Sequence, residues 1–137
     1  MPGYSGRALA DKLGVKPGMR AVLLGAPDGF EALLPGTATT RRLSAGAELA
    51  VVFVARRADL ERRWTAVTAK MTPAGAVWVA WPKKASGVAT DMTENVVRAL
   101  ALPLGLVDNK VCAVDETWSG LRLVWRLEKR PKTAGAR

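Results

Sequence analysis

Four short runs of mostly apolar residues constrain the fold of this chain more than any other feature. They stand well apart in the sequence, at residues 20–25, 49–55, 76–81 and 106–114. Apolar runs of this length are typical of strands that are buried on both faces of a sheet. We therefore expect a sheet whose central strands are covered on both sides.

A long amphipathic segment stands between the second and third runs. Residues 58–71 repeat large apolar side chains at helical spacing, and Pro73 and Gly75 predict the end of that helix. The expected inward-facing residues are Leu60, Trp64, Val67 and Met71.

Two shorter helices are predicted from their ends. One covers residues 5–13 and stops at Gly14. The other begins at Asp91 and Glu94, which have the spacing of a capping box, and continues to about Leu102. Its expected inward-facing residues are Met92, Val96, Ala99 and Leu100.

The remaining strands are predicted from alternating patterns. Thr37–Leu43 has the polar, β-prone pattern of a short edge strand. A turn at Asp115–Gly120 leads into an alternating strand, Leu121–Leu127, which must run antiparallel to the strand before it. Together these elements predict an α/β fold: a three-layer α/β/α, Rossmann-like, mostly parallel sheet of about six strands with an antiparallel C-terminal hairpin. Residues 1–128 are expected to form one domain, and residues 129–137 a basic, flexible tail.

Cysteine and histidine are nearly absent, and this excludes several kinds of chemistry. The 137 residues include one cysteine, Cys112, and no histidine. The sequence therefore predicts no disulfide, no metal site and no histidine-dependent nucleophilic catalysis, and we assign no catalytic residue. Cys112 is expected to be a small core side chain. No segment has the length or apolar character of a membrane span or a signal peptide, so we expect a cytoplasmic protein without membrane association.

Positive charge is plentiful but scattered. The net charge is +9, with one group of arginines at residues 56–63 and another group of basic residues beyond Trp125. This distribution favours solubility over a dedicated nucleic-acid surface, and weak nucleic-acid binding stays open.

Several long segments resemble a known family. They are GYSGRALADKLGVKPGM, LLGAPDGF, WVAWPKKASGVATDMTENVVR and LVDNKVCAVDETWSGLRLV. From Gly3 to about Trp125 the chain resembles a small bacterial family of S-adenosylmethionine methyltransferase-like, Rossmann-like proteins of unassigned activity that carry a WPKKASG motif. The resemblance implies a reduced methyltransferase-like fold without implying a reaction.

The segments that would hold a cofactor depart from the standard pattern. Sheets of this kind bind the cofactor on a Gly-rich loop after the first strand, and an acidic residue that ends the second strand holds the ribose hydroxyls. Here the loop at residues 25–29 contains Pro27, which lacks a backbone donor, and the Thr37–Leu43 segment carries no acid. No cofactor is therefore predicted, and S-adenosylmethionine remains open.

The candidate ligand site lies where such sheets bind ligands, outside the carboxyl ends of the strands. Two lysines, a hydroxyl and a glycine in the Lys83–Gly87 loop could hold an anion together with the N-terminus of the following helix. Alternatively, Lys83 or Lys84 forms an ion pair with Asp115 or Glu116. The expected rim residues are Asp28, Gly29, Trp81, Lys83, Lys84, Ser86, Gly87, Asp115, Glu116 and Trp118.

The five tryptophans fall into two groups. Periodicity places Trp64, Trp78 and Trp125 in the core. Trp81 and Trp118 fall at the rim, where they would either form an aromatic wall for a flat ligand or cover the crevice.

These observations favour a binding module for a small anionic ligand or a protein partner. The alternatives are a divergent S-adenosylmethionine-dependent methyltransferase and a basic nucleic-acid-associated protein. The chain is expected to be a monomer or, if the Thr37–Leu43 edge pairs with a second copy, a homodimer.

Overall fold

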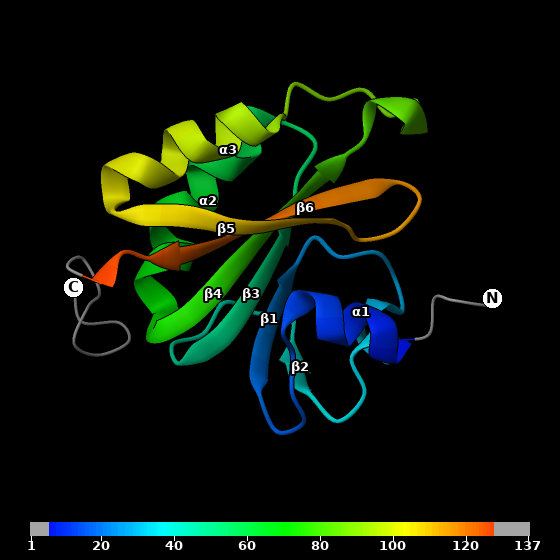
Figure 1. Ribbon diagram of the computed structural model, residues 1–137, viewed down its shortest axis with the longest axis vertical. Helices are drawn as coiled ribbons and strands as arrows, with labels where there is room; N and C mark the ends of the chain where they lie inside the picture. Colours follow the sequence, from blue (N-terminus) through cyan, green and yellow to red (C-terminus); the bar gives the residue numbers. More distant parts are fainter. Residues whose placement is uncertain (1–5, 128–137) are drawn as a thin grey trace.

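The computed structural model describes residues 6–127, which form a mixed six-stranded sheet covered by helices (Figure 1). The strands are β1 (Arg20–Leu24), β2 (Ala38–Thr40), β3 (Ala47–Phe53), β4 (Met71–Pro82), β5 (Leu106–Ala113) and β6 (Trp118–Trp125). The helices are α1 (Gly6–Leu13), α2 (Arg57–Lys70) and α3 (Glu94–Ala101), with short 3-10 turns η1 (Phe30–Leu33), η2 (Lys84–Ser86) and η3 (Leu102–Leu104). The strand order is β2-β1-β3-β4-β6-β5. The first four strands are parallel, and β6 is antiparallel to both of its neighbours, which confirms the predicted fold class.

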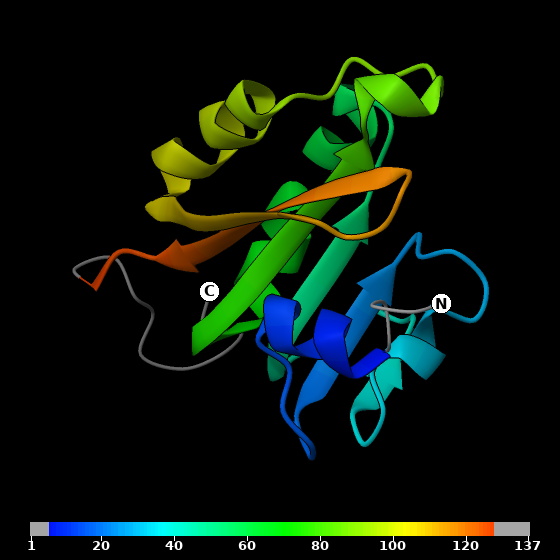
Figure 2. The ribbon, with the colours of Figure 1, turned by 45° about the vertical axis from the view of Figure 1, so that its right-hand side comes forward.

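The helices cover the two faces of the sheet. α1 packs on one face, and α2 and α3 pack on the other (Figures 1 and 2). Side chains of β4 alternate between the two cores: Trp78 belongs to the core under α1, whereas Val77 and Val79 belong to the core under α2 and α3. From Gly75 to Pro82 both faces of β4 are buried, because each has its own helical layer.

Two buried tryptophans each bind the carboxyl end of a helix. The last four carbonyls of a helix have no partner within it. The indole Nε1 of Trp78 donates to the carbonyl of Leu13, at the end of α1, over 2.9 Å. The indole Nε1 of Trp64 donates to the carbonyl of Leu100, in the last turn of α3, over 2.8 Å. The predicted core positions of these tryptophans and of Trp125 are confirmed.

The strand β4 begins earlier than the sequence predicts. Met71 already pairs with Ala47, so Pro73 and Gly75 lie inside the strand and do not end the helix. The register shifts between Ala47 and Leu49, which accommodates the extra residues as an irregularity. A Cβ atom on Gly75 would lie 2.7 Å from Oγ1 of Thr72, so this crowded segment requires glycine.

The predicted capping box at Asp91 is wrong. The Oδ1 atom of Asp91 accepts from the backbone N–H of Arg57 over 2.7 Å, so Asp91 caps the start of α2. Helix α3 begins at Glu94 and is capped by Thr93, whose Oγ1 accepts from Val96 N. Because the helix starts later, its buried residues are Val97 and Ala101, with Val96 and Leu100 half-buried and Ala99 exposed.

The strand β5 is an edge strand, contrary to the predicted core strand, and Leu106 is its one buried residue. β6 inserts between β4 and β5, so most side chains in the second half of β5 reach solvent. Cys112 is therefore only partly buried, and burial raises the pKa of its thiol. Leu127, which lies beyond the end of β6, is exposed.

The predicted edge strand near residue 37 is confirmed as β2, which pairs with β1 alone. Between β1 and β3 the chain contains only β2 and the short turn η1, as its length requires. Within residues 6–127, no helix is long and apolar enough to cross a bilayer. The boundary expected at residue 128 lies at the edge of the described residues, and the predicted tail lies outside them.

Candidate functional site

The chain adds β2 on one side of β1 and then β3 on the other side, so the direction in which strands are added switches between β1 and β3. The connection that leaves β1 packs through Phe30 and Leu34 into the core under α1. The connection that leaves β3 is α2, on the opposite face. In open α/β sheets, ligands bind outside the carboxyl ends of the strands at such a switch point. The loops after β1 and β3 are therefore the first place to look for a site.

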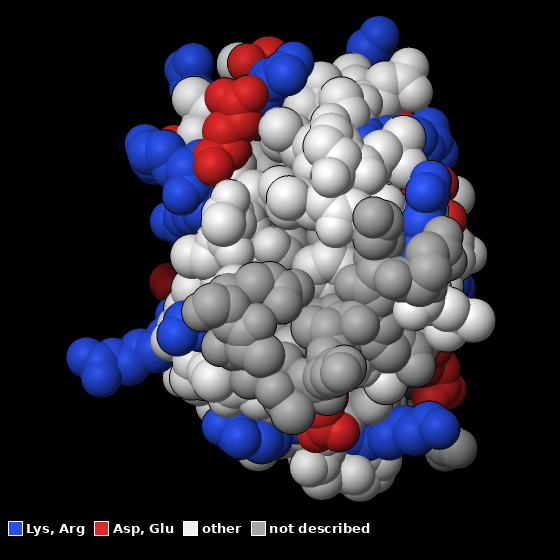
Figure 3. Space-filling view, turned by 90° about the vertical axis from the view of Figure 1, so that its left-hand side faces the viewer, with Lys and Arg blue, Asp and Glu red and all other residues white. Residues whose placement is uncertain are grey.

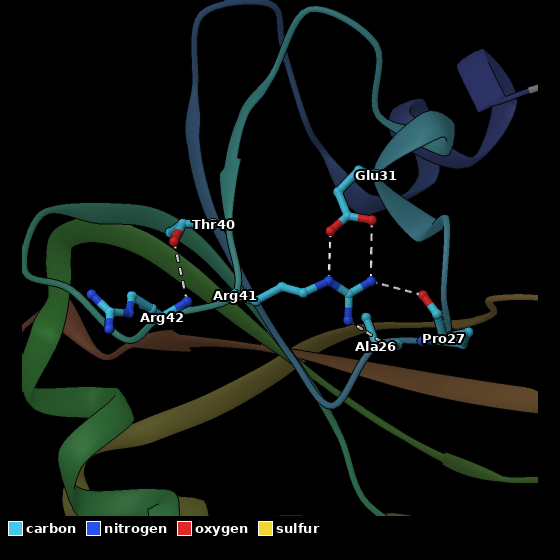
Figure 4. Close-up of polar contacts among 6 residues, drawn as sticks. All are labelled: Ala26, Pro27, Glu31, Thr40, Arg41 and Arg42. Atoms are coloured by element: carbon cyan, nitrogen blue, oxygen red, sulfur yellow. Dashed lines mark hydrogen bonds and ion pairs between the residues drawn. The ribbon is translucent and has the colours of Figure 1, made fainter.

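Arg41 makes several polar contacts beyond the end of β1. It follows β2 directly, and its guanidinium reaches across to the loop after β1 (Figure 4). Nη1 donates to the carbonyl of Ala26 over 2.7 Å, and Nη2 donates to the carbonyl of Pro27 over 2.9 Å. Nε and Nη2 also contact the two carboxylate oxygens of Glu31, at 2.6 and 3.1 Å. Arg41 thus connects the end of β2, the loop after β1 and the turn η1.

Arg41 follows the second strand, where cofactor-binding sheets carry an acidic residue. In the cofactor-binding sheets described above, an acidic side chain at the end of the second strand holds a ribose. Here a guanidinium stands there, fixed by two carbonyls and a carboxylate. An ion-paired arginine therefore stands where a nucleoside cofactor would meet a free carboxylate.

The ion pair affects the titration of Glu31. The hydrogen bond from Arg41 is the main cause that holds the pKa of Glu31 below its ordinary value of 4.5, and a backbone hydrogen bond adds to it. The same contact raises the pKa of Arg41. Because the folded pKa of Glu31 is lowered, the pair stabilises the fold above the ordinary pKa, and this contribution is lost as the pH falls through the folded value.

A carboxyl NMR titration checks this account. We expect the pKa of Glu31 to lie below 4.5 in the wild-type chain and to return toward that value in Arg41→Gln. Arg122→Gln, which removes an arginine from β6, is the control, and Glu31 should titrate in it as in the wild-type chain. An unchanged Glu31 titration in Arg41→Gln would contradict the assigned cause.

A hollow of about 340 Å³ lies beside Arg41, between the end of β1 and the helix α2. We call it the arginine hollow. It is lined by Leu24, Gly25, Arg41, Leu43, Arg62, Arg63, Ala66 and Val67. Arg62 pairs with Asp59 over 2.7 Å, whereas none of the ion pairs among the described residues involves Arg63. Three arginines therefore line the hollow together with apolar side chains, and two of them are already ion-paired, Arg41 with Glu31 and Arg62 with Asp59.

A second hollow of about 250 Å³ lies at the same rim, lined by Arg56, Ala89, Thr90 and Asp91. Its polar side chains already serve the fold. Thr90 Oγ1 donates to the carbonyl of Ala55 over 2.6 Å, and Asp91 caps α2. This hollow offers fewer free polar groups to a ligand than the arginine hollow.

The Lys83–Gly87 loop closes on itself. The hydroxyl of Ser86 donates to the carbonyl of Lys83 over 2.6 Å and accepts from Val88 N, which completes the turn η2. Gly87 ends that turn with a φ of +77°. The next helix begins only at Glu94, so its N-terminus is not part of this loop.

The predicted proximity of this loop to the β5–β6 turn is confirmed. Lys83 N donates to the carbonyl of Thr117 over 2.8 Å. Asp115 is engaged inside its own turn, where Oδ1 accepts from the backbone N–H groups of Thr117 and Trp118. Among the ion pairs of residues 9–127, none joins Lys83 or Lys84 to Asp115 or Glu116. Backbone bonding, and not an ion pair, connects the two loops.

The structure separates the two rim tryptophans. Trp81 is buried in the core under α2 and α3, and Trp118 packs on the other face of the sheet. There Phe53 makes edge-to-face contacts with both Phe30 and Trp118, at centroid distances of 5.1 Å. Because the two indoles lie on opposite faces, they do not form one aromatic wall.

The expected rim residues therefore divide into two groups. Asp28 and Gly29 lie next to the Arg41 contacts, in the loop after β1. The other eight lie on or beside β4 and β6. The residues not predicted for the site are Arg41, Glu31, Arg62 and Arg63. For Arg41 a signal was present, because it directly follows the short edge strand, where an acidic residue was expected.

Figure 3 shows the side of the molecule where α3 and β6 end. In the described part of this view, acidic and basic side chains are interspersed along the margin, and uncharged side chains fill the upper centre. The exposed Leu102 and Leu104 follow the end of α3. The described part of this side is therefore not a continuous basic surface.

Comparisons with known proteins bear on the fold. No family model and no curated protein sequence matches the chain. A solved structure of LepI in complex with S-adenosylmethionine is similar, with a TM-score of 0.54, 13% identity, and coverage of 88% of this chain and 40% of that one. A cysteine-to-alanine variant of LepI with S-adenosylhomocysteine and a substrate analogue has a TM-score of 0.52 at 13% identity, over 86% of this chain and 39% of that one. A structure described as a pericyclic reaction enzyme has a TM-score of 0.53 at 14% identity, with the same coverage.

These likenesses define a class of fold. The described residues form a methyltransferase-like α/β domain, similar in fold to proteins solved with S-adenosylmethionine and S-adenosylhomocysteine. The chain spans about two fifths of the length of those structures. The resemblance to a small bacterial family with a WPKKASG motif stays a prediction.

Proposed function

We propose that this methyltransferase-like domain binds a small anionic ligand in the arginine hollow. The observation that carries the proposal is Arg41, which stands at the end of β2 and is held by the carbonyls of Ala26 and Pro27. Guanidinium groups bind carboxylate and phosphate in a two-point geometry. The proposal keeps the ligand class expected from the sequence and moves the site along the rim from Lys83 to Arg41.

The rest of the lining suits a small organic anion. Arg63 adds a positive group that no ion pair of the described residues neutralises. Leu24, Leu43 and Val67 supply apolar walls. The volume of about 340 Å³ is that of a small-ligand pocket. A ligand with an anionic group next to the arginines and a short apolar body against the walls would match both the positive charge and the apolar lining of the hollow.

A second candidate is a divergent S-adenosylmethionine-dependent methyltransferase. It is supported by the likeness in fold to structures that hold this cofactor and its product. S-adenosylmethionine has a net positive charge, from a sulfonium, an ammonium and one carboxylate. Arg63, which no ion pair of the described residues neutralises, opposes this charge. The charge of the hollow therefore favours the first candidate. A protein partner and weak nucleic-acid binding stay predictions from the sequence.

Isothermal titration calorimetry distinguishes the candidates. The ligands are inorganic phosphate, pyrophosphate, succinate, S-adenosylmethionine and S-adenosylhomocysteine. We expect at least one simple anion to bind, and Arg63→Ala to weaken it about tenfold, the effect of losing one charge-assisted hydrogen bond. Arg122→Ala, which makes the same charge change on β6 outside the hollow, should have little effect.

Two outcomes contradict the proposal. Equal losses in Arg63→Ala and Arg122→Ala indicate general charge attraction without a site. Binding of S-adenosylmethionine or its product, without binding of any simple anion, supports the methyltransferase candidate instead.

A further inference from the structure

We propose that Glu31 is a built-in competitor for the anion site: its carboxylate occupies Arg41 until a ligand carboxylate or phosphate displaces it. This inference rests on the proposed function, and it names the group that the ligand must present. The juxtaposition that carries it is the two-point contact between Glu31 and Arg41. Arg41 lines the arginine hollow, and Glu31 lies outside that lining.

The contact has the geometry of ligand recognition. Oε2 and Oε1 of Glu31 meet Nε and Nη2 of Arg41 at 2.6 and 3.1 Å. A planar carboxylate bound side-on to a guanidinium makes the same pair of contacts. An incoming anion with two oxygens can therefore take the place of Glu31 atom for atom.

Arg41 stays oriented when Glu31 leaves. Its Nη1 and Nη2 donate independently to the carbonyls of Ala26 and Pro27. These backbone acceptors belong to the loop after β1. The carbonyl of Pro27 also accepts from Phe30 N at the start of η1, over 3.2 Å, so this acceptor is held in place by the backbone of the turn and not by the side chain of Glu31. The Nε–Nη2 edge would then face an arriving anion in a fixed orientation, which lowers the entropy cost of binding.

Glu31 can leave without unfolding its turn. Phe30 and Leu34 hold the ends of η1 in the core, at 3% and 2% exposure. The side chain of Glu31 is 37% exposed, and beside one backbone hydrogen bond its contacts in the described residues go to Arg41. An exposed ion pair of this kind contributes little net stability, so a ligand can exchange with it by a rotation of the Glu31 side chain.

Glu31→Gln tests the competition directly. The probes are inorganic phosphate and succinate, titrated into the full chain by calorimetry. We expect Glu31→Gln to raise affinity about two- to fivefold, since the ligand no longer competes with an exposed ion pair. Glu61→Gln is the matched control, because it removes the same charge from a glutamate that pairs with Arg57 outside the hollow. It should raise affinity clearly less.

The pKa of Glu31 supplies a second readout. Saturation of the wild-type chain with succinate should move the Glu31 titration toward its ordinary value, because the ligand takes over Arg41. Equal effects of Glu31→Gln and Glu61→Gln, or a Glu31 titration that succinate does not move, overturn the inference.

The two proposals fail in different ways. If Arg63→Ala weakens binding while Glu31→Gln behaves like Glu61→Gln, the site stands and the competitor does not. If neither probe binds the wild-type chain or Glu31→Gln, both proposals are wrong.

Discussion

Replacing Trp78 by alanine should lower the free energy of unfolding by about 3–5 kcal/mol, the usual effect of truncating a buried aromatic residue. Trp78 has no exposed surface and lies in the core under α1. Its ring also packs over Gly120 of β6, where an added Cβ would lie 3.0 Å from the indole. The substitution therefore leaves a cavity between α1, β4 and β6.

The hydrogen bond of Trp78 adds to this effect. Without the indole N–H, the carbonyl of Leu13 at the end of α1 loses its 2.9 Å donor. Trp78→Phe separates the two contributions, because it keeps most of the ring and removes the donor. We expect it to cost about 1–3 kcal/mol, the penalty of leaving a buried acceptor unsatisfied.

Chemical denaturation followed by far-UV circular dichroism measures both variants. A stable domain of this size unfolds at a cost of about 5–15 kcal/mol, so Trp78→Ala should shift the midpoint strongly. A change below that of Trp78→Phe would contradict the packing assigned to the indole.

Replacing Gly25 by alanine should destabilise the loop after β1 more than the same change at Gly29. Both glycines have a positive φ, of +71° and +80°, so each alanine incurs about 1–2 kcal/mol of backbone strain. At Gly25 the new Cβ would also lie 2.8 Å from the carbonyl oxygen of Phe53, whereas nothing lies within 4 Å at Gly29. We expect the clash to add about 1–3 kcal/mol at Gly25 alone.

The pair of variants is its own control, since the two glycines flank one loop. Denaturation midpoints give the difference in stability. Equal losses would show that the close approach of Gly25 to the end of β3 is relieved by a small shift. Because Gly25 also lines the arginine hollow, anion binding should weaken in Gly25→Ala more than in Gly29→Ala.

Local patterns predicted most of the secondary structure. β1, β3 and α2 were within two residues of their predicted bounds, because each is a continuous run with one clear period. The parallel arrangement and the antiparallel last strand followed from the alternation of strands and helices and from one short turn. The neighbour relation between β4 and β6, which joins the Lys83 loop to Thr117, followed from the same topology.

The errors concern groups whose partners are distant in sequence. Asp91 has the right spacing to cap its own helix, but its carboxylate caps α2, 34 residues earlier. A capping box is read from local spacing alone. It does not account for a backbone N–H group from another helix that the fold brings close to the same carboxylate. Trp81 and Trp118 were grouped because both end up at one rim, although the pleat directs them to opposite faces.

The sequence by itself determined that this chain forms a Rossmann-like sheet with an irregular loop after its first strand, because hydrophobic periodicity and turn residues act locally. Only the tertiary structure decided which side chain contacts that loop. Arg41 and Glu31 are ten residues apart and belong to different elements, and neither signals the other in the sequence. They meet because parallel pairing of β2 with β1 brings the end of β2 to the carboxyl end of β1, where the backbone carbonyls of Ala26 and Pro27 face the guanidinium.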